Sequence, residues 1–126
     1  MQINSAKELE VYKTAYQVAM KVYRASKGWP TDEKFSLTDQ IRRSSRSVCT
    51  NLREAWAKRR YEAHFLSKLT DSDGENGETD TWLDFAKDCG YLSAKDHALM
   101  AYDCRLFGAM LGSMINIPTP FLIKGT

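Results

Sequence analysis

The spacing of apolar residues is the feature that most constrains the fold of this chain. Between its glycines and prolines, apolar side chains recur every three or four residues, the period of one face of an α-helix. No segment alternates apolar and polar residues as a half-buried strand does. We therefore predict an all-α protein, an antiparallel up-down-up-down four-helix bundle with short loops. Three of the expected helices cover residues 5–27, 36–59 and 93–115.

Local signals suggest where these helices begin and end. Ser5 and Glu8 have the spacing of a capping box, and Ser36 is a second N-cap candidate. Gly90 is expected to end the helical region before it, and Ser93 to cap the helix that follows.

The predicted apolar faces follow from the same period. They consist of Leu9, Tyr12, Tyr16, Ala19, Met20 and Tyr23 in the first helix; of Leu37, Ile41, Ser45, Val48, Leu52 and Ala55 in the second; and of Leu99, Met100, Tyr102, Leu106, Phe107, Met110, Leu111 and Met114 in the last. Gly108 and Gly112, four residues apart, would either permit close packing against another helix or be tolerated near a helix end.

The segment from residue 61 to residue 89 allows two structures. Both of its ends carry helical apolar stripes, but an acidic run with Gly74 and Gly77 lies between them. Each glycine costs about 1 kcal/mol in a helix interior, which favours a loop and five helices. A single helix of about 29 residues would instead match the lengths of its neighbours.

Length and composition exclude several classes of protein. With 126 residues the chain suits one domain, residues 1–126 with a C-terminal tail at 117–126. It is 43% hydrophobic and carries a net charge of only +2, which is unlike a disordered chain. It has neither an apolar run of membrane-spanning length nor a signal-peptide pattern, so we expect no membrane partner. The odd number of cysteines, three, predicts reduced thiols and a cytoplasmic protein.

No residue pattern predicts an enzyme or a cofactor site. His64 and His97 have no carboxylate or cysteine at the helical spacing of a nucleophilic pair. The sequence lacks the zinc, di-iron and phosphate-loop motifs. The run that begins at Asp71 starts like a calcium loop, but Asn76 and Trp82 stand where such a loop needs Gly and Glu. We therefore expect no catalytic residues, no metal and no cofactor.

Charge is segregated along the chain. Seven cations and one anion lie between residues 42 and 60, and seven anions and one cation lie between residues 71 and 88. At about 100° per residue, four arginines of the first segment fall within roughly 40° of one another on a helix. We call them the arginine ridge: Arg42, Arg46, Arg53 and Arg60.

Three explanations for this segregation compete. A solvated helix face with ordinary i,i+4 ion pairs fits poorly, because the opposite charges are not interleaved. The basic helix could instead pair with the acidic one, within or between subunits. The ridge could also contact phosphates, with Trp56, Tyr61 or His64 available to stack on bases. Residue types alone leave these last two explanations open.

A motif in the second helix resembles that of a known family. Residues 40–45 read Gln-Ile-Arg-Arg-Ser-Ser, and the match continues through Ser47, Val48, Asn51, Leu52, Glu54 and Ala55. Residues 9–16 and 90–92 fit the same pattern. The chain thus resembles, over about residues 5–116, the four-helix-bundle family associated with intervening sequences of bacterial 23S ribosomal RNA genes, also labelled S23-type.

The resemblance implies more than the residues do. It implies one continuous third helix, residues 61–89, with Gly74 and Gly77 as close-packing positions. Family members are similar to the accessory protein of diversity-generating retroelements, a pentameric barrel that binds nucleic acid and a reverse transcriptase. The resemblance therefore implies a homopentamer and no established enzymatic activity.

We predict a cytoplasmic, non-enzymatic homo-oligomer that binds structured RNA or DNA, the alternative being an oligomeric scaffold that binds another protein and no nucleic acid. The candidate nucleic-acid-binding residues are Arg42, Arg43, Arg46, Arg53, Trp56, Arg59 and Arg60, with Tyr61 as a further stacking group. The candidate oligomer-interface residues are Trp56, Arg59, Asp73, Glu75, Glu78 and Trp82.

Overall fold

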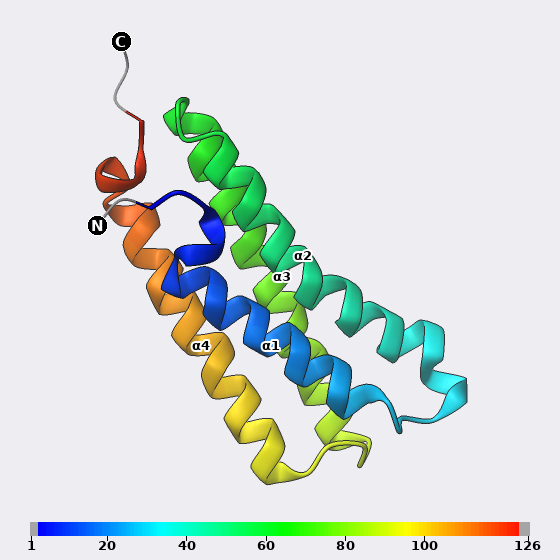
Figure 1. Cartoon of the computed structure of the whole chain (residues 1–126). Helices are drawn as coiled ribbons and strands as arrows, with labels where there is room; N and C mark the ends of the chain where they lie inside the picture. Colours follow the sequence, from blue (N-terminus) through cyan, green and yellow to red (C-terminus); the bar gives the residue numbers. More distant parts are fainter. Residues whose placement is uncertain (1–2, 124–126) are drawn as a thin grey trace.

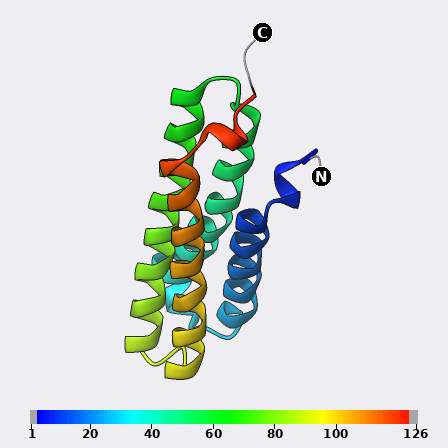
Figure 2. The same cartoon turned by 90° about the vertical axis from the view of Figure 1, so that its left-hand side faces the viewer.

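Four long helices make up the protein. The computed structural model describes residues 3–123, and within them lie α1 (Glu10–Ser26), α2 (Asp39–Ala57), α3 (Glu62–Asp88) and α4 (Ala94–Asn116). No strand occurs in this described part, so the prediction of an all-α protein with four main helices is confirmed. Each helix starts at the end of the molecule where the preceding helix stops (Figure 1). Figure 2 shows both chain ends at one end of the molecule, with α4 between α1 and α3.

The buried face of α1 is not the predicted one. Val11, Val18 and Val22 are the core residues, whereas Tyr16 is 51% exposed. Of the predicted face only Ala19 is buried. The valines and the tyrosines form two apolar stripes about 100° apart, and only one of them can face the other helices. Tyrosine suits the flank, because its ring can pack while its hydroxyl stays in water.

The predicted stripe of α2 is confirmed, but the predicted ends of this helix are wrong. All six stripe residues are buried. Ser36 does not cap the helix, because it lies in a π-helical turn (η3, Lys34–Thr38) that follows a 3₁₀ turn (η2, Thr31–Glu33). Its hydroxyl donates instead to Glu33, with an O···O distance of 2.6 Å. The helix ends at Ala57, two residues before the predicted end.

The first helix also starts later than predicted. Ser5 caps only a 3₁₀ turn (η1, Ala6–Glu8), where its hydroxyl accepts from the backbone N–H of Lys7. The Glu8 carboxylate accepts from Asn4, so the expected capping box does not form. The α-helix begins at Glu10.

The signals between α3 and α4 are confirmed. Gly90 adopts a φ of +83°, the left-handed conformation that commonly terminates a helix. The Ser93 hydroxyl accepts from the backbone N–H of Asp96 at 3.0 Å and caps α4.

The acidic, glycine-containing segment is helical. α3 runs through it without a break, so the loop that propensity favours does not form, and the continuous helix implied by the resemblance does. Phe65, Leu69 and Leu83 are fully buried at its two ends, and this burial offsets the cost of the glycines. A Cβ at Gly74 or Gly77 would meet no atom within 4 Å. The prediction that these glycines mark close packing is therefore wrong within the chain.

We expect Gly74→Ala and Gly77→Ala each to raise the free energy of unfolding by about 0.5–1 kcal/mol, because alanine favours a helix and nothing obstructs its methyl group. Urea denaturation at micromolar protein would measure this. Gly90→Ala is the matched control and should lower stability, because its φ is positive. A loss of stability at Gly74 or Gly77 would show that another chain packs against this side of α3.

α4 carries more apolar residues than its buried face needs. Cys104, Phe107 and Leu111 face the core. The predicted face is too wide, because three of its members are exposed to solvent, and we call them the outer stripe: Leu99, Tyr102 and Leu106. A Cβ at Gly108 would make only an ordinary contact, at 3.8 Å, and one at Gly112 none, so neither glycine marks a close helix approach within the chain.

The end of the described chain docks on the bundle. Phe121 and Leu122 pack against the hydrophobic cluster that contains Phe107, and Ile123 donates its backbone N–H to the carbonyl of Arg59. A short 3₁₀ turn (η4, Thr119–Phe121) shapes this segment. Residues 124–126 of the predicted tail lie outside the described residues.

The core consists of two hydrophobic clusters, and small polar residues lie between them along α2 and α3. Ser44 and Thr79 share a hydrogen bond of 2.8 Å, and Ser72 donates to the carbonyl of Val48, also at 2.8 Å. All three polar side chains are fully buried and paired. Because they are small, they let α2 and α3 pack closely at mid-length.

Candidate nucleic-acid interface

Three cations gather around one tyrosine where α1 meets α2. The guanidinium carbons of Arg42 and Arg46 lie 5.1 and 5.9 Å from the centroid of the Tyr23 ring. The ammonium of Lys27 lies 4.9 Å from the same centroid. Arg42 also donates from Nε to the Ser26 hydroxyl at 2.8 Å. An aromatic face attracts cations, and here it holds three positive charges together. We call Lys27, Arg42 and Arg46 the Tyr23 cation cluster.

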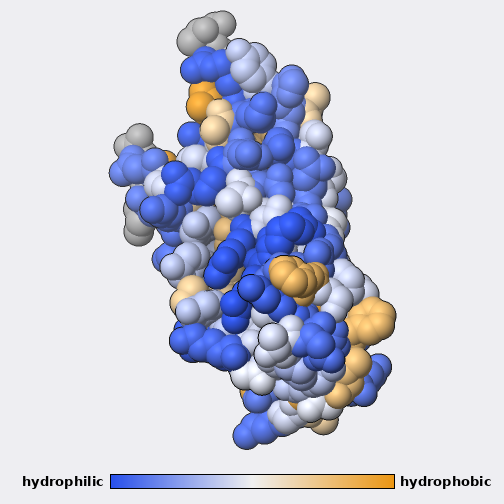
Figure 3. Space-filling model, turned by 90° about the vertical axis from the view of Figure 1, so that its right-hand side faces the viewer, coloured by the Kyte–Doolittle hydropathy of each residue, from blue (hydrophilic) through white to orange (hydrophobic). Residues whose placement is uncertain are grey.

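The rest of the arginine ridge lies further along the chain. Arg53 is exposed on α2, in line with Arg42 and Arg46. Arg60 lies beyond the end of α2, so the prediction that it continues the ridge on the same helix is wrong. Within residues 3–123, no carboxylate lies within 4 Å of the cationic groups of Arg42, Arg46, Arg53 or Arg60. The surface on the α2 side is mostly hydrophilic (Figure 3).

Arg59 and Trp56 form a pair of their own. The Arg59 guanidinium carbon lies 3.6 Å from the centroid of the Trp56 ring, and its Nε donates to the Trp56 carbonyl at 2.8 Å. Burial lowers the pKa of Arg59 from its ordinary value. One face of the indole is therefore covered by the chain itself. Tyr61, the other predicted stacking group, is 61% exposed and meets His64 edge-on at 5.9 Å.

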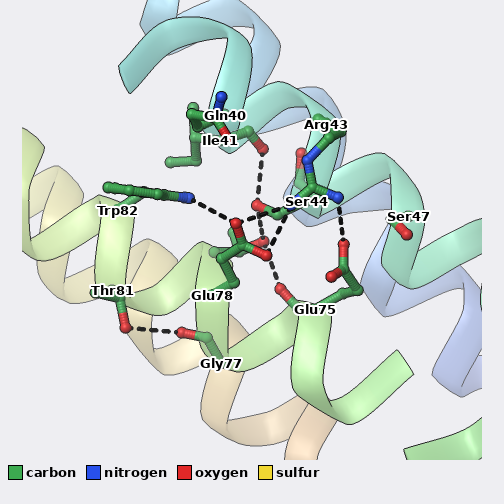
Figure 4. Close-up of polar contacts among 12 residues, drawn as sticks. Gln40, Ile41, Arg43, Ser44, Ser47, Glu75, Gly77, Glu78, Thr81 and Trp82 are labelled. Atoms are coloured by element: carbon green, nitrogen blue, oxygen red, sulfur yellow. Dashed lines mark hydrogen bonds and ion pairs between the residues drawn. The ribbon is translucent and has the colours of Figure 1, made fainter. Parts of the chain in front are cut away.

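Arg43 faces α3 and has carboxylate partners. Figure 4 shows its guanidinium between Glu75 and Glu78, at nitrogen–oxygen distances of 2.9 and 2.7 Å. The Trp82 indole N–H donates to the same Glu78 at 3.3 Å. The hydrogen bond with Arg43 lowers the pKa of Glu78 and raises that of Arg43. The predicted pairing of the basic helix with the acidic one thus occurs within one chain. Within residues 3–123, Arg43 is the only arginine of α2 that forms an ion pair with α3.

The predicted oligomer-interface residues are therefore spread over different environments. Glu75, Glu78 and Trp82 are half-buried in the network of Arg43, whereas Asp73 is exposed. Trp56 and Arg59 lie near the opposite end of α2 from Arg43. The structure does not bring these six residues together into one patch.

Two residues of the Tyr23 cation cluster's surroundings were missed by the sequence reasoning. The apolar period predicts Tyr23 on the buried face of its helix, and no pattern in the sequence singles out Lys27. Their i,i+4 spacing on one helix was the available signal. The contact of these two residues with Arg42 and Arg46 of α2 is a tertiary contact, and no local pattern in the sequence predicts it.

The buried cysteine thiols and His97 lie in surroundings that do not prepare them for catalysis. Burial raises the pKa of Cys49 to about 11 and that of Cys104 to about 12, which keeps both thiols protonated. His97 Nε2 lies 2.8 Å from Asp84 Oδ1 across α3 and α4, a pair that the sequence did not reveal.

In residues 3–123, no group of three or more His, Cys, Asp or Glu residues is placed to hold a metal ion. No helix in that range is long and apolar enough to cross a membrane.

Comparison with known proteins identifies the family. A family model described as "23S rRNA-intervening sequence protein" matches residues 7–113. The fold is similar to that of a protein with unknown function from the S23 ribosomal protein family of Bacteroides thetaiotaomicron VPI-5482, known from a crystal structure at 1.70 Å resolution. The two share 26% sequence identity and a TM-score of 0.75, over 84% of this chain and 95% of that one. No curated protein matches. The resemblance seen in the sequence is confirmed: the chain belongs to the 23S rRNA-intervening sequence protein family.

Proposed function

We propose that this chain is an up-down-up-down antiparallel bundle that assembles into a cytoplasmic homo-oligomer, a pentamer, and binds structured RNA or DNA as a non-enzymatic accessory module. One observation carries the proposal. Arg42, Arg46 and Arg53 line the α1–α2 side without carboxylate partners among residues 3–123, whereas Arg43 on the same helix has two. Guanidinium groups recognise phosphate well, and phosphate contacts supply most of the affinity for nucleic acid.

Charge reversal at two exposed positions tests the proposal. We expect Arg46→Glu combined with Arg53→Glu to weaken binding of a structured RNA at least about 100-fold, because two phosphate contacts become repulsions. Fluorescence anisotropy with a labelled RNA hairpin at low salt measures this. Both side chains are exposed and have no carboxylate partner in residues 3–123, so the circular dichroism spectrum should not change and the melting temperature should change little.

The control variant is Arg105→Glu, which reverses an exposed cation on α4, a helix that carries none of the ridge arginines. It should bind RNA like the unchanged protein. If the double variant loses its oligomer instead of its RNA, these arginines form an assembly surface, and the proposal is wrong.

A second candidate function is a scaffold for other proteins. The outer stripe of α4 favours it, because Leu99 and Tyr102 on that helix are each more than half exposed. Apolar side chains gathered on a surface commonly mark contacts with proteins. Light scattering at low and high salt, with and without bacterial RNA, separates the candidates. A salt-resistant oligomer whose mass ignores RNA would favour the scaffold, and a gain of mass with RNA at low salt only would favour nucleic-acid binding.

A further inference from the structure

We infer that the Tyr23 cation cluster is a phosphate subsite, and that this face reads the backbone of a double helix and not unpaired bases. The inference rests on the proposed function, because it specifies which nucleic acid the proposed interface takes. It depends on two arrangements: the cations that surround Tyr23, and the position of Arg59 against one face of the Trp56 ring.

The cluster holds like charges close together. Lys27, Arg42 and Arg46 all lie within 6 Å of the centroid of one ring, and no carboxylate of residues 3–123 pairs with any of them. Asp39 lines the shallow hollow beside Arg42 and Arg46, but among the ion pairs of residues 3–123 it pairs with neither. These positive charges repel one another. An anion among them relieves the repulsion and gains charge-assisted hydrogen bonds, and a phosphate has enough oxygens to accept from several donors at once.

Two aromatic rings beside the ridge, those of Tyr23 and Trp56, already have cations of the chain against them. Stacking on an unpaired base needs an open aromatic face. The Tyr23 ring already meets three cations, and the Trp56 ring has Arg59 at 3.6 Å, held there by the hydrogen bond from its Nε. The chain's own cations thus occupy one face of the Trp56 ring and surround the Tyr23 ring, which reduces the aromatic surface that an unpaired base could use at these two positions. What this surface offers outward is positive charge.

The cations also have a fixed spacing. Arg42, Arg46 and Arg53 project from one helix, with axial separations of about 6 Å and about 10.5 Å. A duplex presents its phosphates at fixed positions before binding, so it can meet such a row without loss of conformational freedom. A flexible single strand must be ordered first, which weakens its binding. The hollow beside the row is shallow and open, unlike a pocket that encloses a flipped-out base.

The test compares duplexes with unpaired strands that carry the same number of phosphates. We would measure the dissociation constants of a blunt DNA duplex, an RNA duplex and an unpaired oligouridine by fluorescence anisotropy over a series of salt concentrations. We expect both duplexes to bind at least tenfold more tightly than oligouridine. Removing one phosphate contact should also make the slope of log affinity against log salt for the DNA duplex shallower by about 0.9.

The variants are chosen so that the fold is retained. Lys27→Gln and Arg46→Gln remove exposed cations that make no hydrogen bond to the protein's described residues, unlike Arg42, which bonds to Ser26. Each should show the smaller salt slope. Arg105→Gln, on α4, is the control and should leave both affinity and slope unchanged.

Two results would overturn the inference, and they differ in what they say of the proposed function. If oligouridine binds more tightly than the duplexes, and Trp56→Ala but not Arg46→Gln abolishes this binding, the face reads unpaired bases. Nucleic-acid binding would then stand and the duplex inference would fall. If no nucleic acid binds at low salt, the proposed function fails and the inference fails with it.

Discussion

Replacing Phe107 with alanine is expected to lower the free energy of unfolding by about 3–5 kcal/mol. Phe107 is fully buried on α4, in the cluster that includes Leu69 and Leu111. Removing its ring leaves a cavity among side chains that four helices hold in place, so the site can collapse only in part. At about 4 °C per kcal/mol for a domain of this size, the melting temperature should fall by about 12–20 °C.

Urea denaturation and thermal melting would measure the effect of Phe107→Ala. Phe85→Ala is the matched control, since Phe85 is 54% exposed on α3 and its truncation should change the stability of the isolated chain by less than about 1 kcal/mol. A loss below about 2 kcal/mol at Phe107 would show that its cluster repacks freely, which would contradict a close-packed core at this end of the bundle.

Replacing Ser72 with leucine is expected to lower the free energy of unfolding by about 2–4 kcal/mol. Ser72 is fully buried between α2 and α3, where its hydroxyl bonds to the carbonyl of Val48. A leucine loses that hydrogen bond, worth about 1 kcal/mol, and inserts extra methylene groups between closely packed helices, which costs about 1–3 kcal/mol. The loss should appear in the denaturation midpoint.

Ser72→Ala separates these two contributions. It removes the hydrogen bond without adding volume, so it should cost only about 1 kcal/mol. If the leucine variant is as stable as the alanine variant, the space between α2 and α3 accommodates larger side chains, and the small residues at mid-length do not set the separation of these helices.

The success of prediction from sequence differed between the helices for a physical reason. α2 has a single apolar stripe flanked by charges, so its buried face follows from its period alone. α1 has two stripes, one of valines and one of tyrosines, and its own period cannot say which of them meets the other helices. The buried face of α4 cannot be read from its period either, because exposed apolar residues such as Leu99 and Tyr102 lie next to the buried ones.

Propensity was least informative in α3. Gly74 and Gly77 favour a loop locally, at about 1 kcal/mol each, but the complete burial of Phe65, Leu69 and Leu83 on either side favours one rigid helix. Such a gain depends on residues far away in sequence. It could be inferred only from the resemblance to a family in which this helix is continuous.

The candidate site shows the same division. The arginines of α2 follow from helical phase as far as Ala57, and phase fails for Arg59 and Arg60 because the helix ends before them. Which arginines have partners could not be predicted. Arg43 lies one residue from Arg42, yet it faces Glu75 and Glu78 on α3, whereas Arg42 faces Tyr23 on α1.

The sequence by itself determined the class of the fold, the turn between α3 and α4, the buried stripe of α2 and the family, because each depends on signals within a few turns of one helix or on a motif read in order. Only the tertiary structure decided which of the apolar stripes are buried and which cations remain unpaired. Both depend on which helix a side chain faces, and that is decided by how all four helices pack together.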